Sequence, residues 1–194
     1  MSKVSEPNIK KWRAATSLVR GGTQRSEFDE TSEGIFMTSG YVYDSAESAE
    51  AAFKGESTRY IYSRYANPTV TMFEERLALL EGAEYCVGTS SGMAAVFASL
   101  LSQLKAGERV VASRALFGSC HYIIQDMLPN FGIDIQFVDG TDLVQWEAAL
   151  ATPTKAVFLE TPSNPTLDII DLRKVAELSH AAGARLIVDN VFAT

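Results

Sequence analysis

Apolar and polar positions follow two alternating patterns in the second half of the chain. Short apolar runs of strand length alternate with longer segments in which apolar residues recur at helical spacing. The pattern predicts strands at 85–87, 109–112, 133–138, 156–160 and 185–189, and helices at 93–104, 120–128, 142–150 and 172–182. Buried strands that alternate with helices indicate an α/β fold, with a mostly parallel sheet covered by helices on both faces.

The first 60 residues show weak periodicity, apart from a short helix predicted over Ser45–Lys54 with Ser45 as its N-cap. The stretch from Tyr41 to Tyr65 is rich in tyrosine, whereas disordered tails carry few aromatic residues. We therefore expect residues 1–60 to form an extended arm that makes contacts between subunits. A partly ordered tail is the alternative.

The α/β domain is expected to occupy residues 61–194. Its first helix is predicted to begin at Asn67-Pro68, because Asn is a favourable N-cap and Pro a favourable first helical residue. Gly82 is predicted to end this helix.

The stretch from Tyr85 to Leu104 contains a loop of small residues, Gly88–Gly92, between an apolar run and an apolar helix. The free N–H groups at a helix N-terminus and the helix dipole favour a phosphate group at such a turn. A buried turn without a ligand is the alternative. The stretch has no formal charge, but its polar, glycine-containing loop argues against a membrane span.

Composition narrows the classes of partner. The net charge of −7 disfavours a nucleic-acid backbone, and the two cysteines lack the spacing of a metal site. His121 and His180 are far apart in the sequence, so we expect no metal ion. The first residues show no apolar signal segment, which favours a cytoplasmic protein with reduced thiols.

Aromatic and polar residues follow the predicted strands at the edge where an open parallel sheet binds ligands. Phe117 follows the second strand, Asn164 follows the fourth, and Asp189 ends the fifth. Together with the anion site, these side chains suit pyridoxal phosphate, whose ring nitrogen a carboxylate would keep protonated. Core packing for Phe117 and turn positions for Asn164 and Asp189 are the alternatives. A nucleotide-binding domain is disfavoured, because no G-x-G-x-x-G follows the first strand.

Four sequence motifs resemble those of the Cys/Met-metabolism family of pyridoxal-phosphate enzymes. They are YSRYANPT at 62–69, SSGMAA at 90–95, ETPSNPT at 160–166 and VDNVFAT at 188–194, and they occur in the order of the family. The resemblance implies the large domain of the type I fold of pyridoxal-phosphate-dependent transferases. The family includes cystathionine γ-synthase, cystathionine and methionine γ-lyases, and homoserine-ester sulfhydrylases.

The resemblance assigns two groups of residues to the cofactor phosphate. Ser91, Gly92 and Met93 match the phosphate loop of the family. Tyr62 and Arg64 match residues that reach the phosphate of the neighbouring subunit, and the planar guanidinium of an arginine suits that task. The resemblance thus implies a homo-oligomer, and the family suggests a tetramer built from dimers.

The resemblance also assigns residues to the ring of the cofactor. Asp189 matches the catalytic partner of the pyridinium nitrogen, and Asn164 matches the contact of the ring oxygen. Many members have Tyr at the position of Phe117, so stacking is retained here while an acid–base role of a hydroxyl is not. The Schiff-base lysine of the family would lie beyond Thr194, so we expect this chain to be the first part of a longer enzyme.

The implied activity is γ-replacement on O-succinylhomoserine or O-acetylhomoserine with sulfide, which gives homocysteine for methionine biosynthesis. Phe117 and the segment EGIFMTSGYVYDSAES at 33–48 resemble the O-succinylhomoserine sulfhydrylase branch. Two alternatives remain at this point. One is a cystathionine γ-synthase or a γ-lyase of the same family, and the other is a catalytically inactive scaffold that lacks the lysine.

Overall fold

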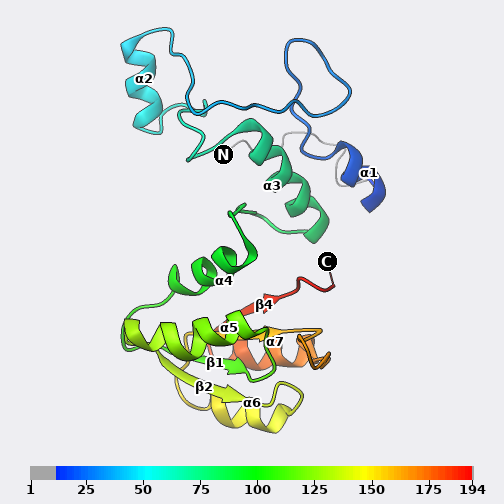
Figure 1. The fold of residues 1–194 in the computed structure, drawn as a ribbon, viewed down its shortest axis with the longest axis vertical. Helices are drawn as coiled ribbons and strands as arrows, with labels where there is room; N and C mark the ends of the chain where they lie inside the picture. The colour runs from blue at the N-terminus through cyan, green and yellow to red at the C-terminus, as the bar shows by residue number, and fades with distance from the viewer. Residues whose placement is uncertain (1–11, 194) are drawn as a thin grey trace. The chain divides into compact units, whose positions relative to one another are not determined.

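The computed structural model describes residues 12–193, in two compact units that comprise Met1–Gly88 and Thr89–Thr194. Figure 1 shows the elements in chain order. The N-terminal unit contains the helices α1 (Ala14–Arg20), α2 (Ala46–Phe53) and α3 (Pro68–Glu81). Within residues 12–193, no helix combines the length and the apolar character that crossing a membrane requires.

The helix α3 begins and ends as its sequence predicts. The Asn67 side chain accepts a hydrogen bond from the Thr69 N–H at 2.9 Å, and Pro68 occupies the first turn. Gly82 ends the helix in the left-handed region at φ 62°, where a glycine has no Cβ penalty. The short helix α2 is likewise confirmed, with the Ser45 hydroxyl accepting from the Ser48 N–H at 3.1 Å.

The arm is fastened to α3 by side chains of that helix and of its cap. Arg76 donates through Nε to the carbonyl of Gly21 at 3.0 Å, and its guanidinium also contacts Glu33. Asn67 donates to the carbonyl of Phe36 at 2.9 Å. The arm and α3 therefore belong to one unit that extends to Gly88, beyond the predicted end of the arm at residue 60. The role of the arm between subunits stays a prediction.

Residues 85–87 form no strand, so this part of the sequence-based prediction was wrong. Tyr85 and Val87 are exposed, and the segment pairs with no strand of the described chain. The N–H of Gly88, at its end, donates to the Glu74 carboxylate of α3 at 2.7 Å instead of to a neighbouring strand. Apolar residues favour a strand where a partner strand and a covering layer exist, and this segment has neither.

The C-terminal unit is built on a parallel sheet of four strands in the order β2-β1-β3-β4. The strands are β1 (Arg109–Ser113), β2 (Asp134–Val138), β3 (Ala156–Glu160) and β4 (Arg185–Asp189). All four lie within one residue of their predicted bounds. The central strand β3 is buried along its whole length, as expected for a strand with helices on both faces.

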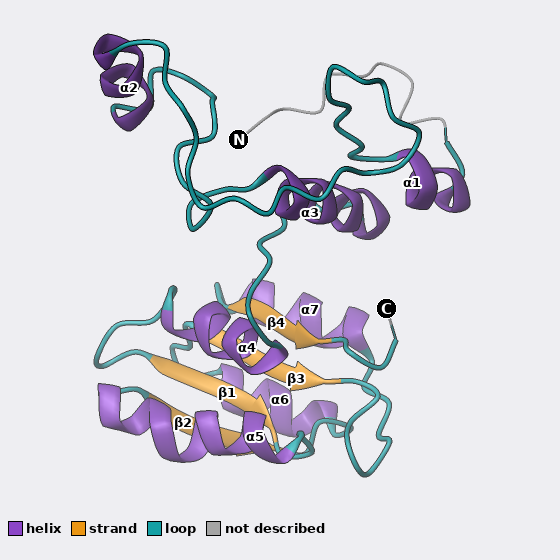
Figure 2. Ribbon diagram, turned by 45° about the horizontal axis from the view of Figure 1, so that its top comes forward, coloured by secondary structure: helices purple, strands orange, loops and turns teal. Residues whose placement is uncertain are grey.

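Two helical layers cover the sheet (Figure 2). One face packs against α4 (Gly92–Leu101) and α5 (Gly118–Tyr122), through a core that includes Leu100, Ile124 and Phe158. The other face packs against α6 (Leu143–Leu150) and α7 (Leu172–Ala181), around the fully buried Trp146. Asp142 and Asp171 cap α6 and α7 with their carboxylates.

The helix predicted over 120–128 differs most from its expected form. It begins as α5, widens into a π-turn at Ile123–Met127, and ends as a 3-10 turn at Leu128–Phe131. Pro129 has no N–H to donate within a regular helix, and Gly132 ends the segment in the left-handed region at φ 75°.

The strand order creates a switch point between β1 and β3. The chain leaves β1 for β2 through the layer of α5, whereas it leaves β3 for β4 through the layer of α7. These two connections run in opposite directions from adjacent strands. Their loops therefore part at the carboxyl ends of the strands, which is where open α/β sheets bind ligands.

Candidate functional site

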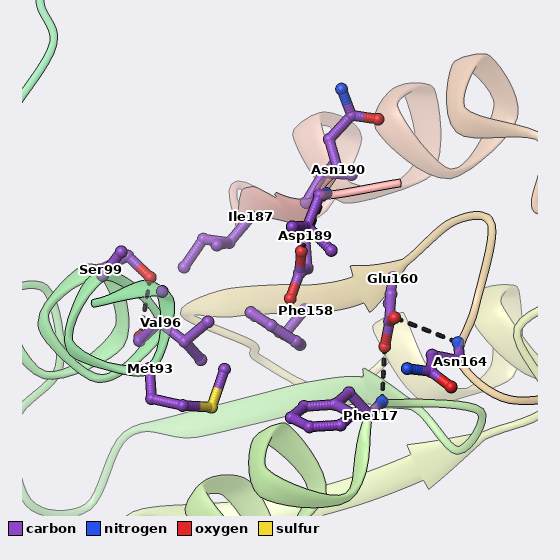
Figure 3. A pocket seen from close by; sticks show the side chains of 14 residues that line it. Met93, Val96, Ser99, Phe117, Phe158, Glu160, Asn164, Ile187, Asp189 and Asn190 are labelled. Atoms are coloured by element: carbon purple, nitrogen blue, oxygen red, sulfur yellow. Dashed lines mark hydrogen bonds between the residues drawn. The ribbon is translucent and has the colours of Figure 1, made fainter. Parts of the chain in front are cut away.

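A pocket of about 430 Å³ lies at this switch point, within the C-terminal unit (Figure 3). Helix α4, the loops after β1 and β3, and the end of β4 supply its walls. Five of the residues assigned from the sequence line it, namely Gly92, Met93, Phe117, Asn164 and Asp189. The structure thus brings together residues that are almost a hundred positions apart.

The N-terminus of α4 forms one side of the pocket. Ser91 is the N-cap, and its hydroxyl accepts from the Ala94 N–H at 3.1 Å. The N–H groups of Gly92 and Met93 precede the first helical hydrogen bond, so they are the donors that an anion at this terminus would use. Gly92 has no atom within 4 Å of the position of a Cβ, so the backbone is open to close approach.

Phe117 forms the opposite side, with its ring toward Met93 in Figure 3. It is the N-cap residue of α5, and the residue is 41% exposed. An apolar ring with this exposure at the wall of a pocket can stack against a planar ligand. Since phenylalanine carries no hydroxyl, this position cannot donate or accept a proton.

Glu160, at the end of β3, connects the two loops of the switch point. Its Oε2 accepts from the Phe117 N–H at 2.5 Å, and its Oε1 accepts from the Asn164 N–H at 3.1 Å. The residue is only 1% exposed. Burial raises the pKa of Glu160 and the charge of Asp189 adds to the rise, whereas the two N–H groups oppose it.

Asp189 ends β4 directly beside Glu160, with which it is paired in register. Its Oδ1 accepts from the Val191 N–H at 3.2 Å, and its Oδ2 accepts from the Cys120 thiol at 3.5 Å. Burial, together with the charges of Asp189 and Glu160 and the bond to Asp189, raises the pKa of Cys120 to about 12. The thiol therefore stays protonated and donates a hydrogen bond that orients the Asp189 carboxylate, and it is no nucleophile.

Tyr62 and Arg64 belong to the N-terminal unit and are both exposed. The Arg64 guanidinium lies 5.6 Å from the centre of the Tyr62 ring and 4.7 Å from that of Tyr65. These cation–π contacts hold the side chain among aromatic rings while its donors stay accessible. The expected contact of both residues with a cofactor phosphate stays a prediction.

Sequence reasoning assigned no role to Glu160 or Cys120. A signal for Glu160 was present, because the strand AVFLE ends in a carboxylate after four apolar residues, and glutamate is rarely buried without partners. The contact of Cys120 with Asp189 joins α5 to β4 across 69 positions, so no local pattern could reveal it.

The donors around the pocket fit pyridoxal phosphate. The terminus of α4 offers N–H groups to a phosphate, Phe117 offers a flat apolar surface, and Asp189 offers a carboxylate that a protonated ring nitrogen requires. The Asn164 side chain also lines this space. All of these groups lie within one unit and around one cavity.

Comparisons with known proteins agree with this reading. The family model of the Cys/Met metabolism PLP-dependent enzymes matches residues 15–194. An O-succinylhomoserine sulfhydrylase of Mycobacterium tuberculosis is 58% identical over 93% of this chain and 44% of its own length. An O-succinylhomoserine sulfhydrylase of Pseudomonas aeruginosa is 45% identical over 92% of this chain and 44% of its own length. The chain thus spans about half the length of the curated relatives it matches.

A solved structure gives the same result for the fold. It is assigned as an O-acetylhomoserine (thiol)-lyase from Campylobacter jejuni and contains a pyridoxyl-lysine phosphate. It is 31% identical and superimposes with a TM-score of 0.86 over 92% of this chain and 44% of that one. The parallel sheet flanked by helices therefore has the architecture of pyridoxal-phosphate enzymes. The chain belongs to the Cys/Met metabolism family of PLP-dependent enzymes.

Proposed function

We propose that the protein to which this chain belongs catalyses γ-replacement on a homoserine ester, O-succinylhomoserine or O-acetylhomoserine, with sulfide to give homocysteine. The observation that carries the proposal is the convergence of Gly92, Phe117, Asn164 and Asp189 on one pocket at the switch point of the sheet. The names of the relatives at 58% and 45% identity support the succinyl ester.

The residues assigned to the cofactor have the following tasks in this proposal. The N–H groups at the start of α4 and the Ser91 hydroxyl bind the phosphate, and Phe117 holds the ring by stacking. Asn164 donates to the ring oxygen. The Asp189 carboxylate, oriented by the Cys120 thiol, keeps the ring nitrogen protonated. A bound pyridoxal phosphate then supplies an electron sink for the substrate carbon from which a proton is removed.

Several groups at or near the pocket transfer no proton in this proposal. Phe117 has no ionisable atom, and Cys120 has a pKa of about 12. None of Lys105, Lys155 and Lys174 lines the pocket. We therefore assign the proton-carrying amine of the reaction to none of these three lysines.

The test is an assay of the full-length protein with O-succinylhomoserine, O-acetylhomoserine and sulfide, with homocysteine as the measured product. The proposal expects homocysteine from at least one ester, in a reaction that depends on pyridoxal phosphate. The proposal would be contradicted if the protein binds the cofactor but forms no homocysteine from either ester.

A γ-lyase is the second candidate, because an L-methionine γ-lyase of Fusobacterium nucleatum is 39% identical over 95% of this chain. A lyase would release ammonia from methionine without an added thiol. The same preparation should therefore be assayed for ammonia with methionine as substrate. Ammonia release faster than homocysteine formation would favour the lyase.

A further inference from the structure

Glu160 is a buried carboxylate whose two oxygens face two different loops. One oxygen accepts from the N–H of Phe117, after β1, and the other accepts from the N–H of Asn164, after β3. Figure 3 shows the side chain between these two residues, with Asp189 on its other side. The carboxylate thus spans the switch point, where the two loops diverge.

The fold by itself gives little reason for a charged group at this position. The other four residues of β3 are apolar and buried, and a buried carboxylate loses its hydration. The neighbouring Asp189 adds a second negative charge in register. A buried carboxylate beside a second negative charge is weak evidence for a gain in stability. The reason for Glu160 therefore lies in the two residues whose N–H groups donate to it.

Those two residues are the ones that would contact the cofactor ring. The backbone position of Phe117 sets the position of its ring, and the backbone position of Asn164 sets the position of its side-chain amide. Both backbone N–H groups donate to the one side chain of Glu160, which extends from the most buried strand. A site on two loops gains its geometry from such a link, because loops otherwise vary independently.

We propose that Glu160 is a positioning residue for the cofactor ring: it sets the spacing of Phe117 and Asn164, so that one can stack on the ring while the other reaches the ring oxygen. This role rests on the proposed function. It assigns to Glu160 no contact with substrate or cofactor and no proton transfer.

The test is Glu160→Gln in the full-length protein, compared with Trp146→Phe as a matched control. Gln keeps the volume of the side chain but has one carbonyl oxygen, so its NH₂ group opposes one of the two backbone N–H donors. Trp146 is fully buried against the other face of the sheet and donates to the carbonyl of Gly140 at 2.9 Å. Its replacement also removes one buried hydrogen bond, away from the pocket.

The readouts are the dissociation constant of pyridoxal phosphate from the protein stripped of cofactor, and the circular dichroism of the bound cofactor. We expect Glu160→Gln to weaken binding by about tenfold or more. The dichroism band per bound cofactor should change, because the ring is held at another angle. Trp146→Phe should lower Tm and leave both readouts at their wild-type values. Binding within twofold of wild type and an unchanged band in Glu160→Gln would overturn the proposal.

If Glu160→Gln does not fold, a measurement on the wild-type protein still tests the proposal. The N–H groups of Phe117 and Asn164 should exchange slowly with solvent in the protein stripped of cofactor, since a buried carboxylate accepts both. Fast exchange of either group would also overturn the proposal. Failure of the wild-type protein to bind pyridoxal phosphate would instead refute the proposed function, so the two failures are distinguishable.

Discussion

At the scale of single residues, the account depends most on Asp189. Its place at the end of a strand was predicted from the sequence, because a carboxylate directly after the apolar run LIV marks the strand end. The orientation of its carboxylate was not predicted, because hydrogen bonds from the Cys120 thiol and the Val191 N–H determine it. Sequence reasoning could place a residue along one element, but it could not identify partners that come from other elements.

Asp189→Ala in the full-length protein should lower kcat by about 10²-fold or more, because the ring nitrogen loses the charge that keeps it protonated. The fold should remain, and Tm should stay close to that of the wild type. Asp126→Ala, which removes an exposed carboxylate outside the pocket, is the control and should leave kcat unchanged. Near-normal turnover of Asp189→Ala would remove this residue from the ring nitrogen.

Cys120 provides a second prediction, on its reactivity. Its pKa of about 12 leaves roughly one thiolate in 10⁴ at pH 8, and its side chain is fully buried. We expect iodoacetamide at pH 8 to leave Cys120 unmodified in the native protein and to alkylate it after unfolding in urea, as read by peptide mass. Alkylation of the native thiol at the rate of a free cysteine would show that it is not the buried donor to Asp189.

At the scale of elements, patterns that depend on neighbouring residues predicted the structure well. The N-caps Ser45 and Asn67 and the four strands of the sheet follow from local rules. The failures depend on distant partners. The segment 85–87 has strand composition without a partner strand, and α1 has no side-chain cap and is held by packing against α3.

The link between the arm and α3 gives a prediction at this scale. Arg76 bonds Gly21, Thr23 and Glu33, so Arg76→Met should destabilise this part of the chain by about 1–2 kcal/mol, a range that allows for partial exposure of the pair. Limited proteolysis should then cut the segment 21–33 faster than in the wild type. Arg173→Met, an exposed arginine on α7, is the control. Equal cleavage rates in both variants would contradict the link.

The same link predicts a pH dependence. The bond from Arg76 holds the pKa of Glu33 below its ordinary value of 4.5. Because the folded pKa is the lower one, the stabilisation is complete above pH 4.5 and is lost as the pH falls through the folded value. Wild-type cleavage at 21–33 should therefore rise in that window, while Glu33→Gln should show a flat profile. A rise of equal size in Glu33→Gln would exclude Glu33 as its origin.

At the scale of the whole molecule, we propose that the arm completes the pocket of a second subunit, with Arg64 on the cofactor phosphate. Arg64→Ala and Asp189→Ala should each be poorly active alone. Mixed under conditions of subunit exchange, they should regain about a quarter of wild-type activity, because half of the random dimers are hybrids and each hybrid has one intact site. No recovery on mixing, with hybrids shown by mass, would place Arg64 in its own subunit's site or in neither.

The most direct test of the central claim is the structure of the full-length protein with pyridoxal phosphate bound. We predict the ring against Phe117, its nitrogen within hydrogen-bond distance of an Asp189 oxygen, and its phosphate at the N-terminus of α4. A cofactor bound elsewhere, or a ring nitrogen that faces no carboxylate, would contradict the account.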